Sequence, residues 1–340
     1  MDLRLSSEQE QLVESFASLL SKHSTPERVR ECEATGFDPE LWTHLGVAGI
    51  VEMGVAEADG GWGASLLDLA LVAEQIGRTV ASAPAIEAQV AARLLARVGT
   101  DEARALLASV LAGEQLVTIA LHPAAHGVAT LVPAAPVSDV VLALDADRLV
   151  SVSPTGCAAV ENLGSMALGD VPIAGGTELA SGADIAAAFE TAIDEWLVLT
   201  GAALGAIGAR ALEIGVEYVK ERKAFGVPIG SFQAISHRLA DSAAALDGAQ
   251  LLSREAAWAH ADDAERFAEL AAMSFAYAYE TARDATYRSL HFHGGYGFMM
   301  EYDVQLYYRR ARAWANVYAE PSVVYQRAAD ARFGPVAAAG

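Results

Sequence analysis

Cysteine and basic residues are both scarce in this chain of 340 residues, and each shortage excludes a class of function. Two cysteines, Cys32 and Cys157, are too few for a disulfide framework or a cysteine-based metal cluster. Lysine and arginine number 23 against 44 aspartates and glutamates, so the formal net charge is −21 at pH 7. Such a surface repels phosphate backbones and anionic lipid headgroups, so we expect neither nucleic acid nor a membrane as a partner.

Hydrophobic runs long enough to span a membrane are missing as well. The longest uncharged stretch, residues 116–138, contains three prolines and two histidines, and the apolar run 196–209 suits a buried core helix better. The first residues lack the basic segment followed by an apolar one that marks a secretory signal. The sequence therefore predicts a cytoplasmic protein, and its 53% hydrophobic and 20% charged residues indicate a folded chain.

Glutamate–histidine pairs with metal-ligand spacing are also absent. None of the eight histidines has a glutamate three residues before it. Helical bundles that hold two iron ions use that spacing, so we expect no metal site and disfavour the hypothesis of a helical-bundle metal protein.

Three stretches of different periodicity divide the chain. The first, 1–113, predicts an N-terminal helical domain. The second, 114–184, has short runs rich in β-branched residues and predicts a small β-sheet domain. The third, 185–340, is helical again and predicts a C-terminal four-helix bundle. The fold class we expect is therefore mainly α with a small β domain.

Local signals mark where some of these elements begin and turn. Ser7 followed by Glu10 has the spacing of a capping box at the first helix. Asp145-Ala-Asp147 lies where a tight hairpin turn is expected. The long periodic segments of the third stretch are separated by short breaks. These segments are residues 185–222, 233–260, 264–292 and 302–330.

The first segment with a chemical signature is Tyr218-Val-Lys-Glu-Arg-Lys-Ala-Phe-Gly-Val-Pro-Ile-Gly-Ser-Phe-Gln233. Arg222 is expected at the end of a helix, where its guanidinium can bind a pyrophosphate with two parallel hydrogen bonds. Phe225 could cover a planar ring, and Gln233 could donate to a ribose or a base. The alternative is an ordinary helix end with solvated basic residues.

The second segment is His291-Phe-His-Gly-Gly-Tyr-Gly-Phe298. Its glycines, among them Gly294 and Gly295, allow a backbone to approach a ligand closely, and amides at the next helix start can face an anion. The alternative is a tight turn between helices, which needs glycines too.

Together the two segments, followed by Leu306-Tyr-Tyr-Arg-Arg-Ala-Arg312, resemble the acyl-CoA dehydrogenase family. The N-terminal stretch agrees in its glycine-rich and polar motifs, which are Leu45-Gly-Val-Ala-Gly49, Gly60-Gly-Trp-Gly63 and Glu74-Gln-Ile-Gly-Arg78. The resemblance implies a helical first domain, a small β domain and a four-helix bundle. It also implies FAD as cofactor, α,β-dehydrogenation of an acyl-CoA thioester, and an electron-transferring flavoprotein as electron acceptor.

The resemblance assigns roles to individual residues. In this family the arginine of the Arg-x-x-Phe-Gly motif, here Arg222, reaches the FAD of a neighbouring subunit, and Phe225 lies beside the dinucleotide. The glycine turn, here Gly294 and Gly295, approaches the same FAD. The usual glutamine two residues before His-Gly-Gly is His291 in this chain.

The middle domain departs from the family pattern. Family members carry a Thr-Glu-Pro-Gly-x-Gly-Ser-Asp-like segment and a later Trp-Ile strand, which hold the isoalloxazine and the thioester. This chain has Thr118-Ile-Ala-Leu-His-Pro123 instead, and its five tryptophans lie outside residues 114–184. A flavin bound within the same chain therefore lacks its expected support.

The catalytic base, a carboxylate that takes a proton from the acyl chain, has two candidate positions. Glu195 is within about one residue, roughly 100° of helical rotation, of the family's position in the first bundle helix. Glu320 follows the arginine-rich helix, in Val317-Tyr-Ala-Glu-Pro-Ser322. For both, the alternative is a solvated helix carboxylate.

Some members of the family work as α2β2 tetramers in which a short, degenerate chain completes the active site of a longer subunit, and these are associated with steroid-CoA breakdown. This chain keeps the motif that acts on a neighbour and lacks the one that acts within its own chain. We therefore expect a longer acyl-CoA dehydrogenase subunit as partner. The alternatives are a homomeric dehydrogenase with an atypical active site and a non-catalytic scaffold or CoA-ester-binding paralogue.

Overall fold

A computed structural model describes residues 4–335 of the chain. By internal contacts the chain divides into two compact units, each assembled from stretches distant in sequence. We call the first the sheet unit, which comprises Glu27–Leu69 and Ser82–Trp196. The second, the bundle unit, comprises Met1–Pro26, Ala70–Ala81 and Leu197–Gly340.

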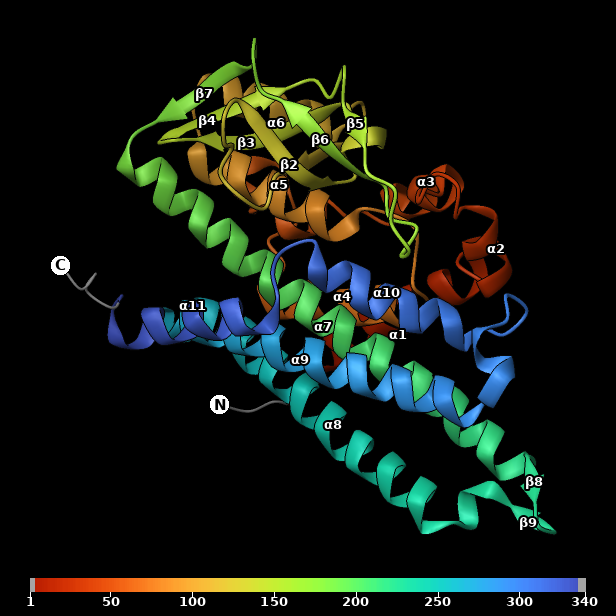
Figure 1. Cartoon of the computed structure of the whole chain (residues 1–340). Coiled ribbons are helices and arrows are strands. Elements are labelled where there is room, and N and C mark those ends of the chain that lie inside the picture. Colours follow the sequence, from red (N-terminus) through yellow and green to blue (C-terminus); the bar gives the residue numbers. More distant parts are fainter. Residues whose placement is uncertain (1–3, 336–340) are drawn as a thin grey trace. The chain divides into compact units, whose positions relative to one another are not determined.

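The sheet unit contains short helices and two small sheets (Figure 1). Its helices are α2 (Pro26–Glu31), α3 (Pro39–Val47), α5 (Ala85–Val98) and α6 (Asp101–Leu111), with 3-10 turns η1 (Glu52–Gly54), η2 (Glu57–Asp59) and η3 (Ala135–Val137). Its strands are β1 (Val117–Ile119), β2 (Val128–Pro133), β3 (Val140–Asp145), β4 (Arg148–Val152), β5 (Ala158–Ala159), β6 (Leu168–Pro172) and β7 (Thr177–Ser181).

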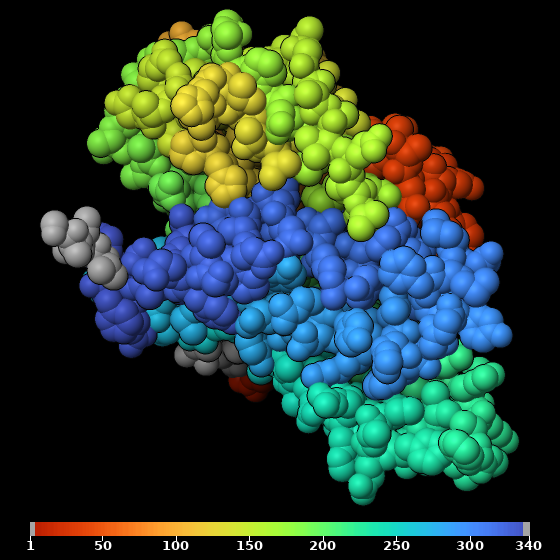
Figure 2. All heavy atoms as spheres, viewed as in Figure 1, coloured from red at the N-terminus to blue at the C-terminus, as the bar shows by residue number. Residues whose placement is uncertain are grey.

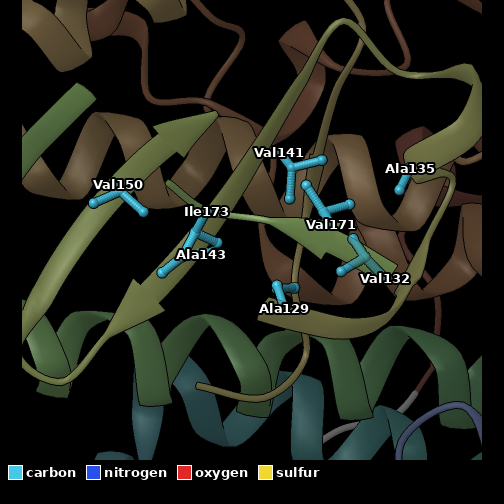
Figure 3. Packing of buried hydrophobic residues seen from close by; sticks show 9 residues of the cluster. Ala129, Val132, Ala135, Val141, Ala143, Val150, Val171 and Ile173 are labelled. Atoms are coloured by element: carbon cyan, nitrogen blue, oxygen red, sulfur yellow. The ribbon is translucent and has the colours of Figure 1, made fainter. Parts of the chain in front are cut away.

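The two sheets have the strand orders β1-β3-β4-β7 and β2-β6-β5. Only the β1–β3 pair is parallel among these strands of the described chain, and β3 and β4 form a hairpin at Ala146-Asp147, where the turn was expected. Alternate residues of a strand share one face, so Val141 and Ala143 of β3 point the same way. Figure 3 shows them packed with Val132 and Val171 of the other sheet in a buried aliphatic core.

Long helices make up the bundle unit. They are α1 (Ser7–His23), α8 (Gln233–Asp262), α9 (Ala264–Phe292), α10 (Val304–Asn316) and α11 (Pro321–Phe333), with the 3-10 turns η4 (Ile229–Ser231) and η5 (Gly294–Phe298). Two further helices, α4 (Leu66–Arg78) and α7 (Ala183–Glu221), each run from the sheet unit into the bundle unit. The mainly α fold with a small β domain is thus confirmed.

Two expected helix boundaries were wrong. The first helix is capped by Ser6, whose hydroxyl accepts from the Gln9 amide while the Gln9 side chain accepts from the Ser6 amide, so the capping box lies one residue before Ser7. The expected helix 302–330 is interrupted between α10 and α11. Pro321 disfavours a helical conformation at the preceding Glu320, whose ψ of 147° is extended, and Pro321 then begins α11.

The apolar run 196–209 was expected to form a buried core helix, and it lies within α7. By length and composition α7 could cross a membrane, but 72% of its most apolar window is buried inside the protein. That burial is typical of the core helix of a soluble protein. The expected three-domain boundaries stay predictions, although helices give way to strands after Leu111 and strands to helix at Ala183.

Candidate functional site

A two-stranded hairpin extends the end of α7 and exposes an aromatic ring. Strands β8 (Lys223–Ala224) and β9 (Val227–Pro228) are joined by Phe225 and Gly226, whose φ angles are +54° and +83°. Positive φ at both central residues is typical of a type I′ turn, and phenylalanine adopts it at a steric cost. Phe225 is 97% exposed, and its ring approaches that of Phe232 edge-on at 6.2 Å between centroids. An apolar ring held out of the fold suggests contact with another molecule.

Arg222 stands at the base of this hairpin and is exposed. Its carbonyl accepts from the amide of Ile229, which closes the hairpin, while its guanidinium makes no hydrogen bond or ion pair with any residue of 4–335. The neighbouring Lys220 and Lys223 are exposed too. In a chain of net charge −21, this group of cations is available for an anionic ligand. Figure 2 shows that, on the face drawn, no other part of the chain lies over the end of the bundle unit that contains this hairpin.

The second expected segment forms η5 and the turn before it. Gly294 has a φ of +62°, which favours glycine. A Cβ at Gly295 would meet nothing within 4 Å, whereas a Cβ at Gly297 would lie 2.3 Å from the Leu290 carbonyl. Gly297 is therefore explained by packing inside the chain, but Gly295 is not. Its open surface fits a close approach by a ligand.

The structure brings the hairpin and the glycine turn to the same end of the bundle unit. The ring of Tyr218, one turn before Arg222, stacks on His293, which precedes Gly294, at 4.0 Å between centroids. Gln233 is exposed as the first residue of α8. His291 is exposed at the end of α9, and its ring lies 5.9 Å from that of Tyr287.

Exposed apolar side chains surround the glycine turn. They are the half-exposed Tyr287, Tyr296, Phe298, Met299 and Met300. Soluble proteins rarely gather so many large apolar side chains on one short segment unless a partner or ligand covers them. This region therefore combines available cations, open glycines and exposed aromatic rings.

Glu195 lies in the sheet unit in an environment unlike that of a base. Its side chain is 0% exposed, and its two oxygens accept from Arg93 at 3.0 and 2.9 Å and from Arg97 at 2.5 Å. Arg93 also donates to the Gly54 carbonyl. A general base must reach the proton that it removes, and a buried carboxylate held by two guanidiniums cannot do so without breaking this cluster. These contacts favour a structural role, with α5 joined to the first part of α7.

Sequence reasoning missed Arg93, Arg97 and a neighbouring carboxyl, Glu87. Trp196 donates from its indole nitrogen to Glu87 at 3.1 Å, and within residues 4–335 no cation pairs with Glu87. Burial raises the pKa of Glu87 above its ordinary value, although the hydrogen bond from Trp196 opposes this. Because α5 and α7 are far apart in sequence, no local motif signals these contacts.

Glu320, the other candidate base, is exposed before the first turn of α11. Its charge helps raise the pKa of Tyr279, an effect second to burial of the phenol, so it lies near the middle of α9. Tyr279 is 13 residues from Phe292, or about 20 Å along a helix. Glu320 is thus separate from the hairpin and the glycine turn.

Comparisons with known proteins place this arrangement in a family. Residues 6–114 match "Acyl-CoA dehydrogenase, N-terminal domain", and residues 187–316 match "Acyl-CoA dehydrogenase, C-terminal domain". The chain is 31% identical over 323 residues to acyl-CoA dehydrogenase IpdE2 of Mycolicibacterium smegmatis, covering 93% of this chain and 96% of that protein. It is 32% identical over 331 residues to acyl-CoA dehydrogenase FadE27 of Mycobacterium tuberculosis, covering 85% and 87%.

Solved structures agree. The ChsE4-ChsE5 complex from Mycobacterium tuberculosis matches with a TM-score of 0.88 at 26% identity, covering 99% of this chain and 100% of the matched chain. The Tcur3481-Tcur3483 steroid ACAD G363A variant matches with a TM-score of 0.87 at 26% identity, covering 96% and 97%. Fold and site thus define an oxidoreductase acting on CH–CH groups. The chain belongs to the acyl-CoA dehydrogenase family.

Proposed function

We propose that this chain is the shorter subunit of a heteromeric acyl-CoA dehydrogenase and completes the FAD site of a longer partner. The observation that carries the proposal is the hairpin, because Phe225 is 97% exposed and the Arg222 guanidinium is available beside it. A residue that serves its own chain would be expected to pack against it. Both solved relatives, Tcur3481-Tcur3483 and the ChsE4-ChsE5 complex, carry the names of two proteins, which supports a partner of different sequence.

The residues present fit the cofactor that the family implies. The Arg222 guanidinium can pair with a pyrophosphate, Phe225 can cover a ring, and the open surface of Gly295 admits a close approach. Gln233 and His291 are exposed at the same end of the bundle unit and can donate hydrogen bonds. When bound, FAD supplies the two-electron acceptor for the oxidation of the acyl chain.

The catalytic base belongs to the longer subunit in this proposal. Within this chain Glu195 is held by Arg93 and Arg97, and Glu320 is distant from the hairpin along the bundle. The contribution of this chain is therefore to bind and orient. Its exposed aromatic side chains shield the FAD from water, and Arg222 neutralises charge on the pyrophosphate of the FAD.

The substrate we propose is an acyl-CoA thioester with a steroid-derived acyl group. The support is the solved relative described as a steroid ACAD, which shares 26% identity with the chain over nearly its whole length. We further propose an electron-transferring flavoprotein as electron acceptor and the cytoplasm as the compartment. Dehydrogenation of steroid-derived and fatty acyl-CoA panels by the purified complex tests the acyl class.

The decisive experiment is the visible flavin spectrum of purified preparations. The chain is expressed alone and together with a candidate longer acyl-CoA dehydrogenase subunit from the same organism. We expect a colourless single chain and a yellow complex with about one flavin per pair of unlike subunits. Yellow single chain that oxidises acyl-CoA contradicts the proposal and supports a homomeric enzyme. Absence of flavin from both preparations supports a scaffold or CoA-ester-binding paralogue.

A further inference from the structure

A buried histidine joins the two segments of the candidate flavin site. His293 directly follows α9 as its C-cap, is 4% exposed, and stacks on Tyr218 of α7 with an angle of 24° between the rings. The ring of Tyr302, which follows η5, approaches edge-on at 6.0 Å between centroids. Nδ1 of His293 donates to the Ser289 carbonyl at 2.7 Å, as the neutral ring does when its proton is on that nitrogen.

These contacts couple positions that are distant in sequence. Tyr218 lies in the last turn of α7, and the amide of Arg222, which directly follows this helix, donates to the Tyr218 carbonyl at 2.9 Å, so the two positions move together. His293 directly precedes Gly294, and the Gly297 backbone packs closely enough that a Cβ there would lie 3.1 Å from the His293 Cβ. A shift of the His293 ring therefore moves the arginine-bearing helix end relative to the glycine turn.

We propose that His293 is a positioning residue whose neutral ring keeps Arg222 and the Gly294–Gly295 turn in the one arrangement that receives the flavin. The inference deepens the proposed function and rests on it for the identity of the ligand. The contacts themselves are properties of this chain alone. Acidification is then expected to release both segments together and to weaken flavin binding.

The surroundings of His293 disfavour a charged ring. Burial lowers the pKa of His293 below its ordinary value, and the bond to Ser289 opposes this only in part. Titratable side chains that face it are Tyr218 from α7 and Tyr302 from the segment after η5. The charged residues within four positions of these two tyrosines are Glu217, Lys220, Glu221, Arg222, Glu301 and Asp303, and burial rather than any of these charges lowers the pKa of His293. The pKa of His293 is lower in the folded chain than in the unfolded chain. The neutral ring therefore stabilises the fold fully at a pH above the unfolded pKa, and this stabilisation is lost as the pH falls through the folded pKa.

The first test uses the full chain without flavin. Amide hydrogen exchange is measured at pH 7.5 and pH 5, corrected for the intrinsic rate, in the wild type and in His293→Phe. Phenylalanine keeps a ring that can stack on Tyr218 but cannot take a proton. We expect residues 222–229 and 294–299 of the wild type to exchange faster together at pH 5, with no such change in His293→Phe. Separate responses of the two segments, or the same response in both proteins, overturn the coupling.

The second test uses the complex with the longer subunit. The flavin dissociation constant is measured by fluorescence quenching between pH 7.5 and pH 5. For the wild type it should rise about tenfold for each pH unit below the His293 pKa. For His293→Phe it should stay within about threefold over the same range. Wild-type-like pH dependence in His293→Phe overturns the proposal, because other groups, such as the exposed His291, are then responsible.

A matched control is His260→Phe. His260 has a comparable edge contact, 5.0 Å to the Phe267 ring, but lies near the other end of the 30-residue helix α8, about 40 Å from Gln233 along the axis. We expect it to keep the wild-type pH profile. A wild-type complex that binds no flavin at pH 7.5 contradicts the proposed function, and the exchange measurement on the single chain still decides the role of His293.

Discussion

The Arg222 hairpin of the bundle unit and the Glu195 cluster of the sheet unit contain the same kinds of charged group in opposite surroundings. Around Glu195, three guanidinium nitrogens satisfy one carboxylate that has no exposed surface. At the hairpin, an arginine and two lysines are exposed, and the guanidinium of the arginine makes no hydrogen bond or ion pair within residues 4–335. A buried charge with a full set of hydrogen bonds serves the fold, whereas exposed cations beside exposed apolar rings indicate a binding site for another molecule. The difference indicates that this chain binds with its helix ends and not with its buried carboxylate.

The strongest test of this comparison is Glu195→Gln. Loss of the carboxylate charge leaves the largely buried Arg93 guanidinium without its partner, while the more exposed Arg97 can turn to solvent, so we expect a cost of about 3 kcal/mol of stability. We expect the melting temperature of the chain to fall by about 6 °C or more. The measurement is thermal unfolding followed by circular dichroism, with Glu320→Gln as the exposed control that leaves it unchanged.

The same two variants are then tested for acyl-CoA turnover in the complex with the longer subunit. If Glu195 were the base, Glu195→Gln would abolish turnover while the fold stayed stable. If Glu320 were the base, the control variant would lose turnover instead. We expect neither pattern, because the proposal assigns the base to the longer subunit.

The sequence predicted the exposed region around Arg222 better than the buried cluster around Glu195. The motifs around Arg222 and Gly294 are contiguous, so each can be read within a few residues. The stack of Tyr218 on His293, which brings them together, depends on how α7 and α9 pack and has no local signal. The Glu195 cluster is harder still, since its partners lie on α5, 98 and 102 residues earlier. Helical rotation of about 100° per residue then decides whether a carboxylate meets solvent or a guanidinium.

Arg222→Ala should lower flavin affinity of the complex by about 10- to 100-fold, since a charge-assisted pair with phosphate is lost. Arg222→Lys should recover only part of this, because an ammonium lacks the planar fork. Flavin content after gel filtration and fluorescence titration measure both. The guanidinium is exposed and makes no hydrogen bond or ion pair within residues 4–335, so the single chain should keep its melting temperature. Full flavin occupancy in Arg222→Ala contradicts a binding role for the hairpin.

Two neighbouring glycines allow a matched pair of substitutions. Gly297→Ala places a methyl 2.3 Å from the Leu290 carbonyl, and such overpacking costs about 1–3 kcal/mol. Gly295→Ala meets nothing within 4 Å and should leave the stability of the single chain unchanged. In the complex, however, Gly295→Ala should lower flavin occupancy several-fold, because its methyl occupies the open surface. A stable Gly295→Ala complex with normal flavin content contradicts a close approach at this turn.

The smallest expected effect concerns Glu87, which, unlike the nearby Glu195, forms no ion pair within the described residues 4–335. Its pKa is raised in the fold by burial, so the contribution of the protonated form to stability is present at low pH and is lost as pH rises through the folded pKa. Glu87→Gln keeps an acceptor for the Trp196 indole and removes the buried charge. We expect its melting temperature to exceed that of the wild type by about 2 °C at pH 8 and to match it near pH 4. Destabilisation at pH 8 would instead mean that the charged carboxylate itself stabilises this part of the sheet unit.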